Sequence, residues 1–276
     1  MTKLYRTSDA VLAVREGGAF ALRDFCFDGL FAAGEPERYV EEAVGRASAI
    51  AFPDVGQPFL APLKSQEVWA AGVSYYRSRV ARMEESESAG ADRFYDMVYA
   101  AERPELFYKA SGVRVRGHLG AVGIRRDSQW SVPEPELTLA INAAGKVFGH
   151  TIGNDMSARD IEGENPLYLP QAKMYRGSCA LGPCLVVGPP PGPEASIDLR
   201  IARAGQEVFA GRTGLGQLKR GFAELADWLF REEDFPQGCL LMTGTGIVPD
   251  SGFSLQSGDR IGIAIEGIGE LVNVVA

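Results

Sequence analysis

The chain has 276 residues, of which 46% are hydrophobic and 23% charged, a balance typical of a soluble globular protein with an ample core. Its 28 basic and 36 acidic residues give a net charge of −8, which disfavours nucleic acid and anionic membrane as partners. No apolar run approaches the roughly 18 residues of a transmembrane helix, and the first ten residues lack the apolar core of a signal peptide. We therefore expect no membrane partner and a cytoplasmic location. The four cysteines form no CxxC pair and are predicted to be free thiols.

Residues 1–62 are predicted to form a small N-terminal α+β domain. Residues 11–16 and 19–22 flank Gly17-Gly18 and favour a hairpin. Pro36 marks the expected start of a helix with one apolar side. No chemical motif stands out here, so we interpret this part as a capping or dimer-supporting domain.

Residues 63–276 are predicted to form a larger, β-rich α+β domain, because short apolar runs outnumber helical patterns. The amphipathic spacing of residues 218–229 predicts a helix that stops before Pro236. The charged segment from residue 77 to about 101 is also expected to be helical. Strands are expected at residues 68–73, 106–109, 113–115, 184–187, 197–201, 240–243, 261–265 and 270–274.

The stretch 134–173 carries the strongest chemical pattern. Apolar and other residues alternate over 136–141, residues 143–145 supply a turn, and 147–152 can form the return strand. Side chains two apart on a strand share a face, so Glu134 and Glu136 point the same way. A turn centred on residue 144 sets 136 opposite 152 and 134 opposite 154. We therefore expect Asp155 beside the two glutamates.

Three converging carboxylates repel one another unless a cation or protons neutralise them. An all-oxygen set without His or Cys suits a hard divalent ion, with Mg²⁺ first and Mn²⁺ or Ca²⁺ next. The alternative is an acidic hairpin face in water. The residues alone leave both interpretations open.

Several motifs in order resemble the fumarylacetoacetate hydrolase family over roughly residues 65–275. These motifs are GVSYY from residue 72, PELFYK ending at 109, EPEL at 134–137, GNDMSARD at 153–160, ENPLYLPQAK ending at 173, and TGTGIVP at 243–249. The resemblance implies a catalytic domain of mixed β-roll type and a divalent metal held by Glu134, Glu136 and Asp155. It also implies a small-molecule 2-oxo acid or acylpyruvate substrate and a homodimer or homotetramer.

The run ENPLYLPQAKMY after NDMSARD is similar to the dehydratase branch of the family, which acts on 2-keto-3-deoxy sugar acids such as 2-keto-3-deoxy-D-arabinonate. The resemblance therefore implies a metal-dependent hydro-lyase of sugar-acid catabolism that yields 2,5-dioxopentanoate. Lys173 occupies the family position of an active-site lysine and is the expected base for the C3 proton. Glu162 is the expected proton donor or acceptor for the leaving hydroxyl.

Further residues of the motifs are expected to contact the substrate. Thr245 and Gly244 offer a hydroxyl and backbone N–H groups to a carboxylate, although such a turn is a weak signal by itself. Ser74, Tyr75 and Lys109 complete the expected contacts.

One departure from the family pattern bears on the reaction type. Hydrolases of the family carry a water-activating His and Glu where this chain has Ser78 and Ala81. The two histidines, His118 and His150, are interpreted as structural or solvent-exposed. The departure favours elimination over C–C bond hydrolysis. An acylpyruvate-type hydrolase, an oxaloacetate-type decarboxylase and a non-catalytic binding protein remain alternatives, and Arg159 and Asp160 are expected to form a supporting ion pair.

Overall fold

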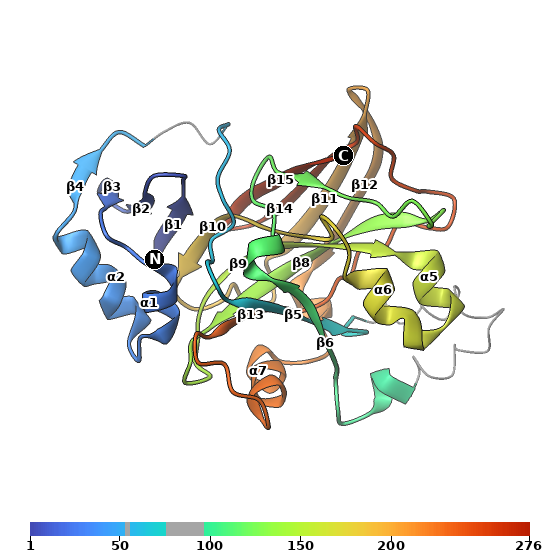
Figure 1. The fold of residues 1–276 in the computed structure, drawn as a ribbon, viewed down its shortest axis with the longest axis horizontal. Coiled ribbons are helices and arrows are strands. Elements are labelled where there is room, and N and C mark those ends of the chain that lie inside the picture. Colours follow the sequence, from blue (N-terminus) through green and yellow to red (C-terminus); the bar gives the residue numbers. More distant parts are fainter. Residues whose placement is uncertain (53–55, 76–96) are drawn as a thin grey trace.

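The computed structural model describes residues 1–52, 56–75 and 97–276. Its strands form two sheets, one of ten strands and one of five, and helices cover only parts of them (Figure 1). The large sheet has the order β4 (Ser48–Ile50), β3 (Gly18–Leu22), β2 (Val11–Arg15), β1 (Thr2–Arg6), β10 (Cys179–Val187), β9 (Val147–Ala158), β8 (Ser131–Ile141), β13 (Cys239–Met242), β5 (Glu67–Gly72) and β6 (Glu105–Ser111). The small sheet has the order β12 (Gln206–Gly214), β11 (Ser196–Arg203), β14 (Arg260–Ile265), β15 (Gly269–Val275) and β7 (Ala121–Val122).

The helices of the described residues are short. They are α1 (Phe27–Ala32), α2 (Pro36–Gly45), α5 (Arg159–Glu164), α6 (Leu169–Lys173) and α7 (Phe222–Phe230), with 3₁₀ turns at Gly112–Arg114, Pro166–Tyr168 and Leu215–Gln217. Residues 97–100 are also helical. This strand-rich architecture confirms the predicted β-rich α+β class. None of these helices is long and apolar enough to cross a membrane.

Strands β8 and β9 are buried along their length, except for the partly buried Val147 at the start of β9, because the two sides of this hairpin face different layers. Leu137, Leu139 and Ile141 pack in the core shared with the small sheet. Ala140 and Phe148 belong to a second core, which α1 and α2 close from the other side. Because both sides are covered, the pair also buries polar residues such as Thr138, Thr151 and Asn154.

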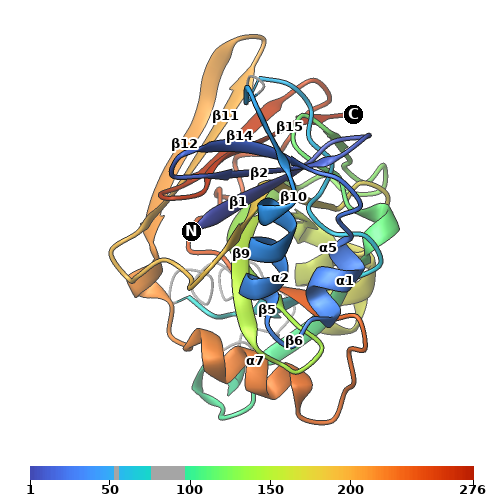
Figure 2. The same ribbon diagram turned by 90° about the vertical axis from the view of Figure 1, so that its left-hand side faces the viewer.

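The N-terminal segment extends the large sheet instead of standing apart from it. Strand β1 pairs with β10 in antiparallel register, with Leu4 opposite Leu185. Figure 2 shows α1 and α2 beside the first strands, on the side turned toward the viewer. The expected hairpin and the helix beginning at Pro36 are both confirmed. A domain boundary at residue 62 stays a prediction.

Some predicted elements differ from the structure. Residues 112–114 form a 3₁₀ turn and not the expected strand at 113–115, because the chain tightens between β6 and β7. Helix α7 begins at Phe222 and not at 218, because Gly221 is extended and the preceding residues form another 3₁₀ turn. The exposed strand β12 has no clean apolar alternation and was not predicted. Of the helix expected over 77–101, residues 97–100 are helical and the part before 97 lies outside the described residues.

Candidate metal centre

The three expected carboxylates converge on one end of the β8–β9 hairpin. Glu134 lies directly opposite Asp155, and Glu136 lies opposite Gly153. The expected register was off by one residue, because the ladder shifts between Ala140 and Ile141. This irregularity carries the extra residue that brings Asp155 into direct register with Glu134.

The carboxylate trio is almost closed to solvent. One oxygen from each of Glu134, Glu136 and Asp155 lies within 4.8 Å of the others, and the residues are 5%, 1% and 1% exposed. Burial, and next the charges of Asp155 and Glu134, raises the pKa of Glu136 well above its ordinary value. The cost of holding these charges together is what a bound cation would remove. The acidic face in water, left open above, is excluded by this burial.

Lys173 lies at the end of α6, and its ammonium has three acceptors. Its Nζ lies 2.9 Å from Glu134 Oε2, 3.1 Å from Asp155 Oδ2 and 2.6 Å from Ser157 Oγ. The residue is 1% exposed, which overturns the default interpretation of a lysine as a surface charge. The structure therefore brings the expected base to the expected metal ligands.

Two further buried cations reach the same carboxylates. Arg159, the first residue of α5, places NH1 2.5 Å from Glu134 Oε1 and 3.4 Å from Glu162 Oε2. Lys109 on β6 pairs with Asp155 Oδ1 and also donates to the carbonyl oxygens of Met156, at 3.0 Å, and Lys173, at 2.5 Å. The sequence analysis missed this role of Arg159, because its burial and its contact with Glu134 appear only in the folded structure.

The expected ion pair between Arg159 and Asp160 is wrong. Asp160 instead accepts hydrogen bonds from Ser128 Oγ and the main-chain N–H of Gln129, each at 2.6 Å. Consecutive residues at the start of a helix point in different directions, so Arg159 turns inward while Asp160 caps the neighbouring loop. Glu162, one turn after Arg159, is 1% exposed and lies 3.8 Å from Lys173 Nζ.

A glycine turn after β13 holds Glu136, the third of the expected metal ligands. The main-chain N–H of Gly244 donates to Glu136 Oε2 at 2.6 Å. Ser74 Oγ donates to the carbonyl oxygen of Thr243 at 2.6 Å, and Thr245 Oγ1 contacts the main chain of Ile247 at 3.2 Å. Gly244 has φ +92, and a Cβ there would overlap Ser74 Oγ, so both the backbone angle and the close approach require glycine.

A small pocket opens onto the carboxylates. Its described lining joins the metal ligands to expected and unexpected residues: Ala71, Gly72, Val73, Phe107, Glu134, Glu136, Asp155, Arg159, Lys173, Gly244 and Thr245. The lining does not include Ser74, Tyr75, Lys109 or Glu162. Substrate contact by Ser74, Tyr75 and Lys109 stays a prediction. Ser78 and Ala81 lie outside the described residues.

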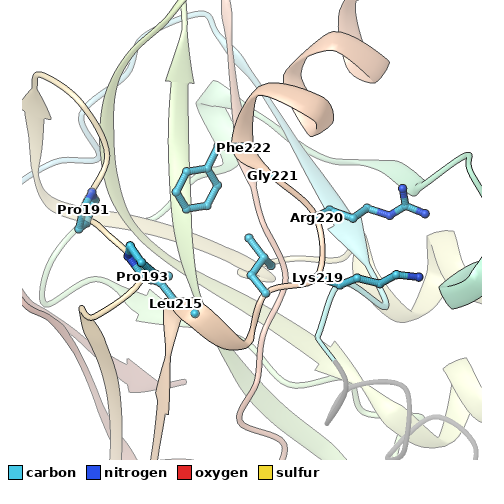
Figure 3. A pocket seen from close by; sticks show the side chains of 9 residues that line it. Pro191, Pro193, Leu215, Lys219, Arg220, Gly221 and Phe222 are labelled. Atoms are coloured by element: carbon cyan, nitrogen blue, oxygen red, sulfur yellow. The ribbon is translucent and has the colours of Figure 1, made fainter.

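The described lining of a second pocket has no carboxylate, unlike the site around Glu134, Glu136 and Asp155. Pro191, Pro193, Leu215 and Phe222 give it an apolar wall (Figure 3). Lys219 and Arg220 point away from that wall, and they donate to the carbonyl oxygens of Tyr99, Ala101 and Glu102. These two cations therefore hold the segment before β6 in place.

Both histidines are buried, which excludes the solvent-exposed interpretation. His118 is buried and its Nδ1 accepts a hydrogen bond from Val272 N at 3.2 Å, while His150 is 3% exposed. The free thiols expected from the cysteine pattern are confirmed, with Cys26 partly buried and Cys179, Cys184 and Cys239 buried.

The fold and the buried carboxylate trio define a metal-dependent enzyme of the kind expected from the motifs. The model of the fumarylacetoacetate hydrolase C-terminal domain matches residues 74–276. The chain belongs to this family.

Two relatives are similar over 78% of the chain and 73% of their own length. One, from Haloferax volcanii, is named probable 2-keto-3-deoxyxylonate dehydratase and is 44% identical over 218 residues. The other, 2-dehydro-3-deoxy-D-arabinonate dehydratase from Saccharolobus solfataricus, is 41% identical over 217 residues. Among solved structures, 2-keto-3-deoxy-D-arabinonate dehydratase complexed with magnesium and 2,5-dioxopentanoate superposes with a TM-score of 0.84. It is 32% identical, with 99% of this chain and 98% of that chain covered.

Proposed function

We propose that this protein is a Mg²⁺-dependent hydro-lyase that removes water from a 2-keto-3-deoxy sugar acid. The first candidate substrate is 2-keto-3-deoxy-D-arabinonate, and the product is 2,5-dioxopentanoate, as in the breakdown of pentose-derived sugar acids. The observation that carries the proposal is the buried trio of carboxylates with Lys173 Nζ 2.9 and 3.1 Å from two of them. The substrate class is supported by the two relatives and by the magnesium complex of the similar structure.

Glu134, Glu136 and Asp155 are the residues that would hold the ion, since three buried carboxylates fit a hard divalent cation. Bound Mg²⁺ would act as a Lewis acid toward the carboxylate and 2-oxo oxygens of the substrate, which stabilises the charge that forms when C3 loses a proton. Gly244 N–H keeps the carboxylate of Glu136 in place for this task.

Lys173 is proposed as the base that takes the C3 proton. Two of the three acceptors of its ammonium are carboxylates of the metal site, so a cation there competes with the ammonium and favours its neutral form. Glu162, near both Lys173 and Arg159, is the proposed proton donor to the C4 hydroxyl as it leaves. Loss of water, followed by transfer of one hydrogen from C5 to C3 and of the C5 hydroxyl proton to C4, gives the dioxo acid. Thr245 and Gly244 line the pocket and are proposed to contact the substrate.

The variant Lys173→Met tests the role of the base. It keeps a buried side chain of similar length without an amine, so turnover should fall by at least ~10²-fold, the lower scale for a positioned acid or base. Exchange of the C3 protons with deuterated water, followed by proton NMR, should stop. Mg²⁺ affinity should be retained or improved, because a competing charge is gone. Persistent enzyme-dependent C3 exchange would assign proton removal to another group, with Glu162 the next to test.

The cellular setting is also part of the proposal. Free thiols in the core are typical of a reducing compartment, which supports a cytoplasmic location. The family resemblance supports a homodimer or homotetramer. Light scattering coupled to size-exclusion chromatography distinguishes these from a monomer.

A further inference from the structure

Ser157 follows the ligand Asp155 by two residues on β9, so both side chains leave the same face of the strand. Its side chain is fully buried at 0% exposure. The hydroxyl donates to the carbonyl oxygen of Asp155 at 3.1 Å and accepts from Lys173 Nζ at 2.6 Å. A hydroxyl has one proton to donate, so the bond to Asp155 leaves only its lone pairs for Lys173.

The three acceptors around Lys173 Nζ are not equivalent. Glu134 Oε2 and Asp155 Oδ2 belong to the carboxylate trio, so a bound cation draws on the same oxygens. Ser157 Oγ is neutral and stands outside the trio, and it makes the shortest of the three contacts. Its hydrogen bond to Lys173 therefore does not compete with metal binding.

We propose that Ser157 is a positioning residue for Lys173. It holds the Nζ atom beside the carboxylate trio when the carboxylates bind a cation. The proposal rests on the proposed role of Lys173 as the base. An ammonium or amine at the end of four single bonds samples many positions, and a displacement of about 1 Å at such a group can cost ~10²-fold in rate. Lys109 restrains the other end of the residue, since it donates to the main-chain carbonyl oxygen of Lys173.

The variants Ser157→Ala and Ser157→Thr separate positioning from simple stability. Ser157→Ala removes one oxygen and adds no volume, and it should lower kcat by roughly 10- to 100-fold. KM for the sugar acid and the calorimetric Mg²⁺ affinity should change by less than about threefold, because the Ser157 hydroxyl contacts no carboxylate oxygen of the trio and Ser157 does not line the pocket. Ser157→Thr retains the hydroxyl and should recover most of kcat. Ser131→Ala is the matched control, since Ser131 is a 2% exposed serine of the same hairpin that contacts Ser128 and not Lys173.

A second readout needs neither metal nor substrate. In metal-free protein labelled with ¹⁵N-lysine, an ammonium with three acceptors exchanges its protons slowly and gives an NMR signal, which Lys173→Met identifies. Ser157→Ala should broaden or abolish that signal. The signal of Lys109, whose acceptors do not include Ser157, should persist as an internal control. An unchanged Lys173 signal would overturn the proposal.

A double-mutant cycle shows whether Ser157 acts through Lys173. Ser157→Ala should cause no further loss of the residual rate in the Lys173→Met background, because there is no amine left to position. The same fold-loss in both backgrounds, or a kcat of Ser157→Ala within about twofold of wild type, would contradict the proposal. If Lys173→Met itself remains active, the proposed base is wrong, and the ammonium signal still decides whether Ser157 holds Lys173.

Discussion

Glu134 contacts two cations at once, since Lys173 lies at Oε2 and Arg159 at Oε1. A single buried carboxyl therefore combines the proposed role of metal ligand with that of the anion that balances two charges. Removing it leaves Lys173 and Arg159 without their nearest carboxylate in a water-poor site, which is costly. This double role could not be predicted from the hairpin pattern.

The variant Glu134→Gln should weaken Mg²⁺ binding by at least about tenfold and abolish turnover, because it removes a charged ligand. The metal-free protein should also lose stability. Glu162→Gln is the matched control: Glu162 is a buried carboxyl near the same Arg159 and Lys173, but it is not one of the trio. Calorimetric titration measures the Mg²⁺ affinity of both variants and of wild type. Equal affinities of Glu134→Gln and wild type would contradict the assignment of Glu134 as a ligand.

The site residues predicted from local sequence patterns lie on one hairpin, whereas the residues that were missed make long-range contacts. The period of a strand gave the shared face of Glu134 and Glu136, and the return strand brought Asp155, even with a register error of one residue. Lys109 and Arg159 reach the site from β6 and α5, and no local periodicity predicts such tertiary pairs. The motif resemblance supplied Lys173 because it carries long-range information.

At the scale of elements, one face of the β8–β9 hairpin serves two purposes. Glu134 and Glu136 share the face of Ala140, which farther along packs in the core closed by α1 and α2. Helices α5 and α6 lie toward the other side of the molecule, where they bring Arg159 and Lys173 to the carboxylates (Figure 1). The pattern of a buried strand thus predicts the core part of this face but not the helices that complete the site.

A substitution at Gly244 should affect Mg²⁺ affinity more than the stability of the fold. Gly244→Ala forces a Cβ into Ser74 Oγ and displaces the N–H that holds Glu136, so Mg²⁺ affinity should fall by roughly 10- to 100-fold, the scale of lost ligand support. Gly258→Ala is the control, because Gly258 has a similar φ of +87 with nothing within 4 Å of the added Cβ. It should cost about 1 kcal/mol of folding free energy and leave Mg²⁺ affinity unchanged. Similar Mg²⁺ affinities in the two variants would contradict this role of the turn.

His150 on β9 should make the protein sensitive to acid. Burial lowers the pKa of His150 to about 4, and the charge of Lys3 acts in the same direction. The folded-state pKa lies below the unfolded value of about 6.5, so the unfolded chain binds protons first as the pH falls. The stability involved is fully present above pH ~6.5 and is lost between about 6.5 and 4, up to about 3 kcal/mol.

Urea unfolding of wild type and His150→Leu across this pH range isolates the effect. All other titrating groups are shared, so the difference between the two free energies of unfolding should shift by about 3 kcal/mol from pH 6.5 to 4. Curves that stay parallel over the range would show that His150 does not change its protonation on unfolding.

At the scale of the molecule, the ten-stranded sheet runs from the N-terminal strands through β8 and β9 to β6. The class of fold was predictable because alternating and apolar runs dominate the chain. The continuity of the sheet was not, since the pairing of β1 with β10 joins residues more than 170 positions apart. The carboxylate trio and Lys109 thus stand on strands of one sheet, with Arg159 and Lys173 added from helices α5 and α6.

The central claim is dehydration of a 2-keto-3-deoxy sugar acid at the carboxylate site. The most direct measurement follows 2-keto-3-deoxy-D-arabinonate by proton NMR with metal-free protein, before and after Mg²⁺ is added. A parallel sample contains acetylpyruvate as the alternative substrate. We expect 2,5-dioxopentanoate to form only after Mg²⁺ addition and to stop forming when a chelator is added, with little pyruvate or acetate from acetylpyruvate. Cleavage of acetylpyruvate as fast as dehydration of the best sugar acid, or no dehydration of any 2-keto-3-deoxy sugar acid with Mg²⁺, would contradict the account.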